Sequence, residues 1–254
     1  RTLPDLSRSQ PVLYNNLLLV LTISNQLCAL DASSGQIIWE HDGLPEVLSY
    51  GKGVAPVVHN GRVLVCYSSG ELVILDALNG QELWQLNLAR DNDGLPGFSA
   101  LGLESQPILD GDNVYIASSS NVLMKLNIAT GQTVWKRKLS DIQSMNKSGN
   151  TLFITTNAKQ VAAINASNGM VVWATDLSIE GAKAAKSNKP VNYLTPVVTN
   201  GQLMIFASDG KMRILSPNTG LVEKVVDIDK NALFITVDDN VMVYTKTSLL
   251  KKKA

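Results

Sequence analysis

The chain has 254 residues, 45% of them hydrophobic, and its 22 lysines and arginines balance 22 aspartates and glutamates. This length supplies enough core for one large domain or two ordinary ones. The zero net charge argues against a nucleic-acid-binding protein, which needs a basic face to neutralise phosphates. The longest apolar run, residues 17–23, is far shorter than the roughly 20 residues that a membrane-spanning helix requires.

The N-terminus and the cysteines carry few signals. The first residues show neither the apolar core of a signal peptide nor a lipid-accepting cysteine, so a targeting segment is either absent or outside this sequence. Cys28 and Cys66 stand alone in apolar, strand-like runs, without a CxxC pair or a neighbouring histidine. We expect small buried core residues at both positions, with a disulfide between them as the alternative.

A ten-residue pattern recurs along the chain. Each copy begins with leucine or isoleucine, continues with Asp, Asn or Ser, and reaches a glycine four residues later. The copies cover residues 30–39, 75–84, 126–135, 164–173 and 215–224. Their glycines and tryptophans are Gly35 and Trp39, Gly80 and Trp84, Gly131 and Trp135, Gly169 and Trp173, and Gly220, with Lys224 in place of a fifth tryptophan. Such a repeat predicts stacked copies of one structural unit.

Each part of the pattern has a structural reason. The Asp or Asn side chain caps backbone N–H groups of a tight turn, and the glycine supplies a positive φ. The flanking apolar residues alternate with polar ones, as in half-buried strands. A tryptophan at one fixed place offers a large flat wedge between neighbouring sheets. We therefore assign the repeated glycines and tryptophans structural roles.

Two more strand-like runs precede each turn, for example residues 55–61 and 62–67 ahead of the second copy. Four short antiparallel strands in roughly 40–50 residues are typical of a β-propeller blade. A β-sandwich fits less well, because its strands do not repeat as a four-strand unit. We predict an all-β fold of four-stranded antiparallel propeller blades, about six in this chain, forming a single domain over residues 1–254.

Five full blades are expected over about residues 9–227, and a partial sixth over residues 231–251. The first residues, 1–6, resemble the end of an outermost strand. Either they complete the sixth blade and close a six-bladed ring, or they end a blade whose earlier strands are missing. In the second case the chain is part of a larger ring, for example an eight-bladed one.

The repeat is similar to the PQQ-like propeller repeat of quinoprotein dehydrogenases and of the BamB family, the propeller lipoproteins of outer-membrane protein assembly. The order of the blades, with turn glycines 45, 51, 38 and 51 residues apart, resembles BamB, particularly its alphaproteobacterial form. Supporting segments are residues 6–11, 23–32, 67–72 and 135–140. The resemblance implies an eight-bladed ring, anchored by an N-terminal lipidated cysteine on the periplasmic side of the outer membrane. This chain matches about the last six blades and lacks that cysteine, which favours a partial chain.

The resemblance also implies a function without catalysis. BamB-like proteins contact the POTRA domains of BamA and assist folding and insertion of outer-membrane proteins. Leu48 and Tyr50 stand where the family's Leu-x-Leu-Arg contact has its two leucines, and Gly51 replaces the arginine, with Lys52 as the nearest basic residue. Glu104 stands at one acid of the family's Asp-x-Asp contact, and Gly102 replaces the other. The implied partners are BamA, other subunits of the assembly machinery and nascent outer-membrane proteins, which exposed sheet edges would guide.

Three long loops, residues 41–53, 89–105 and 178–193, join blades in the same way and are expected on one face of the disc. The first two mix apolar and polar residues. Exposed apolar loops on a rigid scaffold suggest a protein-binding face. The alternative is that they fold back and bury themselves. The third loop is basic and is expected to be solvated.

Other chemistry finds little support in the sequence. His41 and His59 form no metal set or catalytic triad, and both are expected in turns or on the surface. Residues 91–94 begin like a calcium loop, but no glutamate stands at its twelfth position. We expect no catalytic residue, metal, cofactor or small-molecule substrate. Two alternatives remain: a periplasmic PQQ-like propeller that binds another protein or a glycan, and a quinoprotein oxidoreductase, for which the expected Cys-Cys pair is missing.

Overall fold

The computed structural model divides into two compact units, Arg1–Ser140 and Asp141–Ala254. It describes residues 4–44, 53–88, 103, 105–118, 121–178 and 191–228, and the backbone of the strands at 232–237, 241–245 and 249–252. Strands, turns and irregular segments make up these residues, and none of them is helical.

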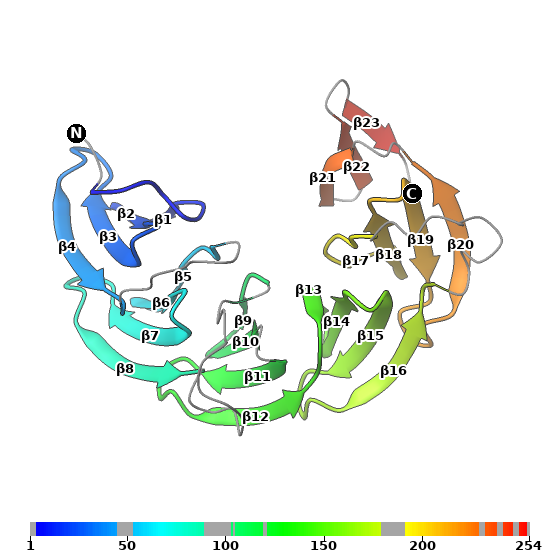
Figure 1. Cartoon of the computed structure of the whole chain (residues 1–254), viewed down its shortest axis with the longest axis horizontal. Coiled ribbons are helices and arrows are strands. Elements are labelled where there is room, and N and C mark those ends of the chain that lie inside the picture. Colours follow the sequence, from blue (N-terminus) through cyan, green and yellow to red (C-terminus); the bar gives the residue numbers. More distant parts are fainter. Residues whose placement is uncertain are drawn as a thin grey trace. The chain divides into compact units, whose positions relative to one another are not determined.

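The first unit contains three four-stranded antiparallel sheets, each a simple meander of consecutive strands (Figure 1). The strands are β1 (Val12–Tyr14), β2 (Leu17–Leu21), β3 (Gln26–Asp31) and β4 (Ile37–Asp42); β5 (Val57–His59), β6 (Arg62–Cys66), β7 (Glu71–Asp76) and β8 (Glu82–Asn87); and β9 (Ile108–Asp110), β10 (Asn113–Ser118), β11 (Val122–Asn127) and β12 (Thr133–Lys138).

The second unit contains two further four-stranded sheets and a three-stranded one. Their strands are β13 (Ile142–Ser148), β14 (Thr151–Thr156), β15 (Gln160–Asn165) and β16 (Val171–Asp176); β17 (Val197–Thr199), β18 (Gln202–Ala207), β19 (Lys211–Leu215) and β20 (Val222–Asp227); and β21 (Ala232–Val237), β22 (Val241–Thr245) and β23 (Leu249–Lys252). Five four-stranded antiparallel blades and a shorter sixth sheet confirm the predicted all-β propeller fold.

The turn between the third and fourth strands of each four-stranded blade has one geometry. In the first blade Asp31 Oδ1 accepts hydrogen bonds from the backbone N–H groups of Ser33 (3.0 Å) and Ser34 (2.7 Å). The N–H of Gly35 donates to the carbonyl of Asp31 at 2.8 Å, and Gly35 has a φ of 67°. The corresponding glycines of the other four blades have φ values of 71–72°. This conformation favours glycine, because a side chain there would crowd the backbone.

Three of the four tryptophans join consecutive blades within a unit. The indole Nε1 of Trp39 donates to the carbonyl of Ala77 at 3.0 Å, and Trp84 bonds Ile128 in the same way at 3.2 Å. In the second unit Trp173 donates to the carbonyl of Pro217 at 3.0 Å. Each of these three tryptophans follows a β-bulge in its strand pair and reaches the turn of the next blade. The tryptophan, expected as a packing wedge between sheets, therefore also donates a directional hydrogen bond to the next blade.

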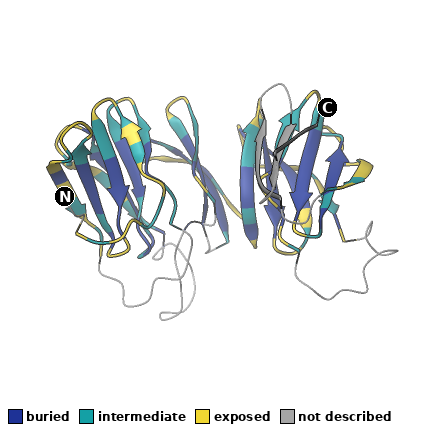
Figure 2. Ribbon diagram, turned by 90° about the horizontal axis from the view of Figure 1, so that it is seen from above, coloured by how far each residue is buried: buried dark blue, intermediate teal, exposed yellow. Residues whose placement is uncertain are grey.

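The hydrophobic core lies between neighbouring sheets, and the middle strands of each blade are its most buried parts (Figure 2). One cluster joins the first two blades of the first unit and includes Leu19, Val65 and Tyr67. A second cluster joins the second and third blades through Leu72, Ile116 and their neighbours. Cys28 is buried and Cys66 is partly exposed, and both are free thiols.

The N-terminal segment pairs with the first blade. Arg8 N donates to the carbonyl of Leu21 at 2.7 Å, and Ile23 N donates to the carbonyl of Leu6 at 2.9 Å. Residues 1–3 lie outside the described residues. Closure of a ring by residues 1–6 therefore stays a prediction.

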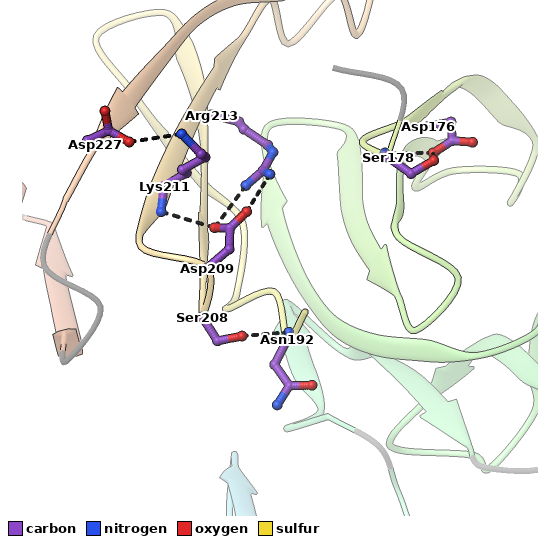
Figure 3. Close-up of polar contacts among 8 residues, drawn as sticks. All are labelled: Asp176, Ser178, Asn192, Ser208, Asp209, Lys211, Arg213 and Asp227. Atoms are coloured by element: carbon purple, nitrogen blue, oxygen red, sulfur yellow. Dashed lines mark hydrogen bonds and ion pairs between the residues drawn. The ribbon is translucent and has the colours of Figure 1, made fainter. Parts of the chain in front are cut away.

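The second unit holds an almost fully buried cation. The Arg213 guanidinium, on β19, is bound by both carboxylate oxygens of Asp209, at 2.7 and 3.4 Å (Figure 3). It also lies 5.4 Å from the centre of the Tyr193 ring. Pairing and ring contact together compensate the desolvation of the charge, so this arginine belongs to the core.

Candidate partner-binding site

The four residues predicted to bind a partner, Leu48, Tyr50, Lys52 and Glu104, lie outside the described residues. The structure does describe the segments from which their loops leave the first unit and to which they return. We call these segments the loop roots: residues 42–44 and 53–55 for the first loop, and residues 103 and 105–107 for the second.

The outgoing root of the first loop is held by side chains of the first two blades. Gly43 N donates to the carbonyl of Asn25 at 2.8 Å, and Leu44 N donates to Glu71 Oε2 at 2.8 Å. The buried amide of Asn25 donates to the carbonyl of Leu44 at 3.1 Å and accepts the hydroxyl of Ser68 at 2.7 Å. Asn25 adopts a φ of 62°, which asparagine tolerates better than most residues. The loop therefore departs from a rigid base.

An aromatic pair, His41 and Tyr67, packs against the outgoing root of the first loop. The His41 and Tyr67 rings are stacked, with centroids 5.8 Å apart, and His41 Nδ1 lies 2.7 Å from the Tyr67 hydroxyl. Burial raises the pKa of Tyr67, and its hydroxyl donates to the His41 carbonyl at 3.1 Å. A Cβ on Gly43 would come within 2.5 Å of the Tyr67 ring. Only glycine fits at this position without displacement of the ring.

The structure corrects one expectation for the histidines. His41 does not lie in a turn or on the surface: it is on β4, its side chain is 18% exposed, and its Nε2 lies 3.7 Å from Glu82 Oε2. The prediction was wrong because the last residues of β4 face Tyr67 of the next blade, a contact that the local pattern does not show. His59 ends β5 beside a turn, as expected, and its Nε2 lies 3.3 Å from Asp112 Oδ1.

The returning roots of the two loops are bonded to each other. The side-chain amide of Gln106 donates from Nε2 to the carbonyl of Ala55 at 2.9 Å and accepts at Oε1 from Ala55 N at 3.0 Å. Gly53 lies against Arg8, whose carbonyl would be 2.7 Å from a Cβ at that position. Leu103 is buried in the core that joins the second and third blades and forms a bridge with Ser118. The two loops thus return to neighbouring, tightly held positions.

The residues that hold these roots were not among those predicted from the sequence. Gln106 precedes Pro107 at the start of the third blade, and Ala55 precedes Pro56 at the same place in the second. This shared position before proline is a signal that the two segments correspond. This shared position does not show that the Gln106 side chain bonds the backbone of Ala55, because the two residues are 51 positions apart in the sequence.

The described part of the chain holds no group of three or more His, Cys, Asp or Glu side chains placed to bind a metal ion. Nor does a helix in that part have the length and apolar character needed to cross a membrane. The expectation of a chain without catalysis or cofactor stays a prediction.

A family described as "Outer membrane protein assembly factor BamB" matches residues 1–175 and 146–251. The two matched ranges together reach across almost the whole chain. The chain belongs to the BamB family. The resemblance stated from the repeats and blade order is thereby confirmed.

Curated relatives support membership of the BamB family. An uncharacterized protein of Rickettsia conorii is 36% identical over 258 residues, covering 97% of this chain and 62% of the relative. The outer membrane protein assembly factor BamB of Shewanella oneidensis is 23% identical, covering 95% of this chain and 60% of the relative. The chain thus spans about 60% of the length of these relatives.

Solved structures share the fold. The crystal structure of BamB from Moraxella catarrhalis superposes with a TM-score of 0.78 at 19% identity, covering 98% of this chain and 72% of that one. The quinohemoprotein alcohol dehydrogenase of Comamonas testosteroni gives a TM-score of 0.62 at 15% identity, covering 88% of this chain and 43% of that one. Likeness at such identities shows the propeller fold alone and says nothing of activity.

Proposed function

We propose that this BamB-family chain is a non-catalytic scaffold of the outer-membrane β-barrel assembly machinery, on the periplasmic side of the outer membrane. Its partner is BamA, bound through the POTRA domains, and its role is to assist folding and insertion of outer-membrane proteins. The observation that carries the proposal is the match of the BamB family to residues 1–175 and 146–251.

The proposed contact surface is formed by the first two long loops. Leu48 and Tyr50 supply apolar contact, and Lys52 and Glu104 supply charges of opposite sign. The bond between Ala55 and Gln106 supports this assignment, because it joins the segments to which both loops return. Holding both loops on one rigid base reduces the entropy lost on binding.

The charges have a separate role from the apolar residues. Charges at the rim of an interface mainly raise the association rate and set the orientation, whereas buried apolar side chains slow dissociation. Lys52 and Glu104 would therefore orient the POTRA domains, and Leu48 and Tyr50 would hold them. Other subunits of the machinery and nascent outer-membrane proteins are the further partners of this scaffold.

Binding to a purified fragment of BamA containing the POTRA domains tests the proposal. The full chain is expected to bind, and Leu48→Asp combined with Glu104→Lys is expected to abolish binding. A matched control is Leu78→Asp combined with Glu223→Lys, which changes an exposed leucine in a blade turn and an exposed glutamate on β20. Unchanged binding of the first variant would refute the site, and no binding of the natural protein would refute the function.

A further inference from the structure

The fourth strand of each blade forms its outer edge, and β16 differs from the others in charge. Charged side chains occupy exposed positions in the other four outer strands whose side chains the structure describes: Glu40 and Asp42 in β4, Glu82 in β8, Arg137 and Lys138 in β12, and Glu223, Lys224 and Asp227 in β20. In β16 the exposed positions are Val171, Val172 and Ala174. Val171 is 51% exposed, Val172 is 58% exposed, and the preceding Met170 is 60% exposed.

The backbone of β16 offers unpaired groups at this edge. Leu177 N donates to the carbonyl of Lys159 at 2.9 Å, and the register pairs Thr175 with Val161 and Ala174 with Ala162. Because an antiparallel ladder alternates, Thr175 turns its N–H and C=O groups toward β15, and Ala174 turns them away. β16 is the last strand of its sheet, and no strand among the described residues lies beyond it.

The one charge of β16 is held at the end of the strand. The Asp176 carboxylate accepts hydrogen bonds from the backbone N–H of Ser178 at 2.8 Å and from its hydroxyl at 2.6 Å (Figure 3). It therefore caps the turn that follows β16 and leaves residues 170–175 without a charge. Proteins commonly protect exposed edge strands with charges, because a strand that paired there would have to desolvate them. The outer edge of this blade lacks that protection.

We propose that the β16 edge binds an extended, uncharged polypeptide segment rich in apolar residues, which adds as a fifth strand to the blade. The outward N–H and C=O groups of Ala174 are free to pair with an added strand, and the apolar side chains around them select against a charged one. This inference rests on the proposed function, because outer-membrane strands before insertion have this alternating, weakly charged pattern. It names where and how such a client binds.

The test uses the full chain and a fluorescein-labelled, end-blocked peptide of twelve residues in which valine and threonine alternate. Fluorescence anisotropy measures its binding. Ala174→Pro removes an N–H that points away from β15, so the ladder within the blade stays intact. The matched control is Gln85→Pro, at the equivalent outward position of β8, an edge that carries Glu82. Val172→Lys, matched with Val134→Lys on β12, tests the same edge without changing the backbone.

We expect the natural chain to bind the peptide, and Ala174→Pro and Val172→Lys to weaken binding by about tenfold or more, with the two controls unchanged. Circular dichroism checks folding, and if Ala174→Pro unfolds, the lysine pair decides. Equal binding by both members of the lysine pair would overturn the inference. So would the absence of peptide binding, or self-association through β16 that excludes the peptide. Both β16 variants are expected to retain BamA binding, so loss of BamA binding by the natural chain would refute the proposed function separately.

Discussion

Gln106 bonds both backbone groups of Ala55, with its amide nitrogen 2.9 Å from the Ala55 carbonyl and its amide oxygen 3.0 Å from the Ala55 N–H. The Gln106 side chain thus makes the two hydrogen bonds that the backbone of a neighbouring strand would make, at the place where two long loops return to the propeller. This contact links the stability of the scaffold to the geometry of its proposed binding surface.

Gln106→Ala should therefore affect both properties. Loss of two exposed hydrogen bonds is expected to lower the free energy of unfolding by about 1 kcal/mol. BamA affinity should fall about three- to tenfold, because the loop roots are no longer held together. Urea denaturation and a binding titration measure the two effects. Gln85→Ala, on the exposed outer strand β8, is the control, and an equal loss of stability in both variants would contradict the special role of Gln106.

Two glycines with the same backbone conformation separate turn strain from contact with tryptophan. Gly35 and Gly80 have φ values of 67° and 72°. A Cβ at Gly35 would meet nothing within 4 Å, whereas at Gly80 it would lie 2.6 Å from the Trp39 ring. Gly35→Ala is expected to cost about 1 kcal/mol from the backbone alone.

Gly80→Ala is expected to cost about 1–3 kcal/mol more than Gly35→Ala, because the Trp39 ring must move or the turn must distort. Urea denaturation of both variants measures the difference. Equal losses would show that the ring yields freely and that it does not lock the second blade to the first.

The turn carboxylate Asp31 should make stability depend on pH in the acid range. Hydrogen bonds from the Ser33 hydroxyl and the Ser34 N–H lower the pKa of Asp31 from 3.8 to about 2. The ionised form therefore stabilises the fold above pH 4, and this contribution is lost as the pH falls from about 4 toward 2.

Asp31→Asn isolates this effect, since Asn127 and Asn165 already occupy the same turn position in other blades. The difference in Tm between natural protein and variant should shrink as the pH falls from 4 to 2. Thermal unfolding followed by circular dichroism at stepped pH provides the measurement. A difference that stays constant down to pH 2 would contradict the role of the charge.

The thiols should be unreactive in the folded protein. Burial, with a smaller effect of the Glu40 charge, raises the pKa of Cys28 from 9.0 to about 11. Desolvation of the thiol also raises the pKa of Cys66, although that residue as a whole is partly exposed. Ellman's reagent at pH 8 is expected to label neither thiol in the native chain and both in guanidinium chloride.

The same shift predicts weaker stability in alkali. The unfolded Cys28 thiol ionises near pH 9 and the folded one near pH 11, so its contribution is lost as the pH rises between these values. Cys28→Ala should lack this component of the pH dependence. Rapid labelling of Cys28 at pH 8 under native conditions would contradict the buried, protonated state.

The blades were predictable because their signals are local. Asp31 and Gly35 encode a turn within five residues, and the alternation around them encodes the strands on either side. The partial burial of His41 was not predictable in this way, because it depends on packing against Tyr67 of the next blade. Gln106 was missed for the same reason, since its partner Ala55 belongs to another blade.

The sequence by itself determined the all-β class, the four-strand unit, the positions of the turns and the BamB family, because these properties follow from patterns that repeat within tens of residues. Only the tertiary structure decided which side chains hold the loop roots and which positions of the outer edges are exposed. Those features arise where separate blades meet, or from the direction in which a strand turns its backbone groups. These features depend on packing between blades and on hydrogen-bond register, and the sequence of a single blade does not specify either of them.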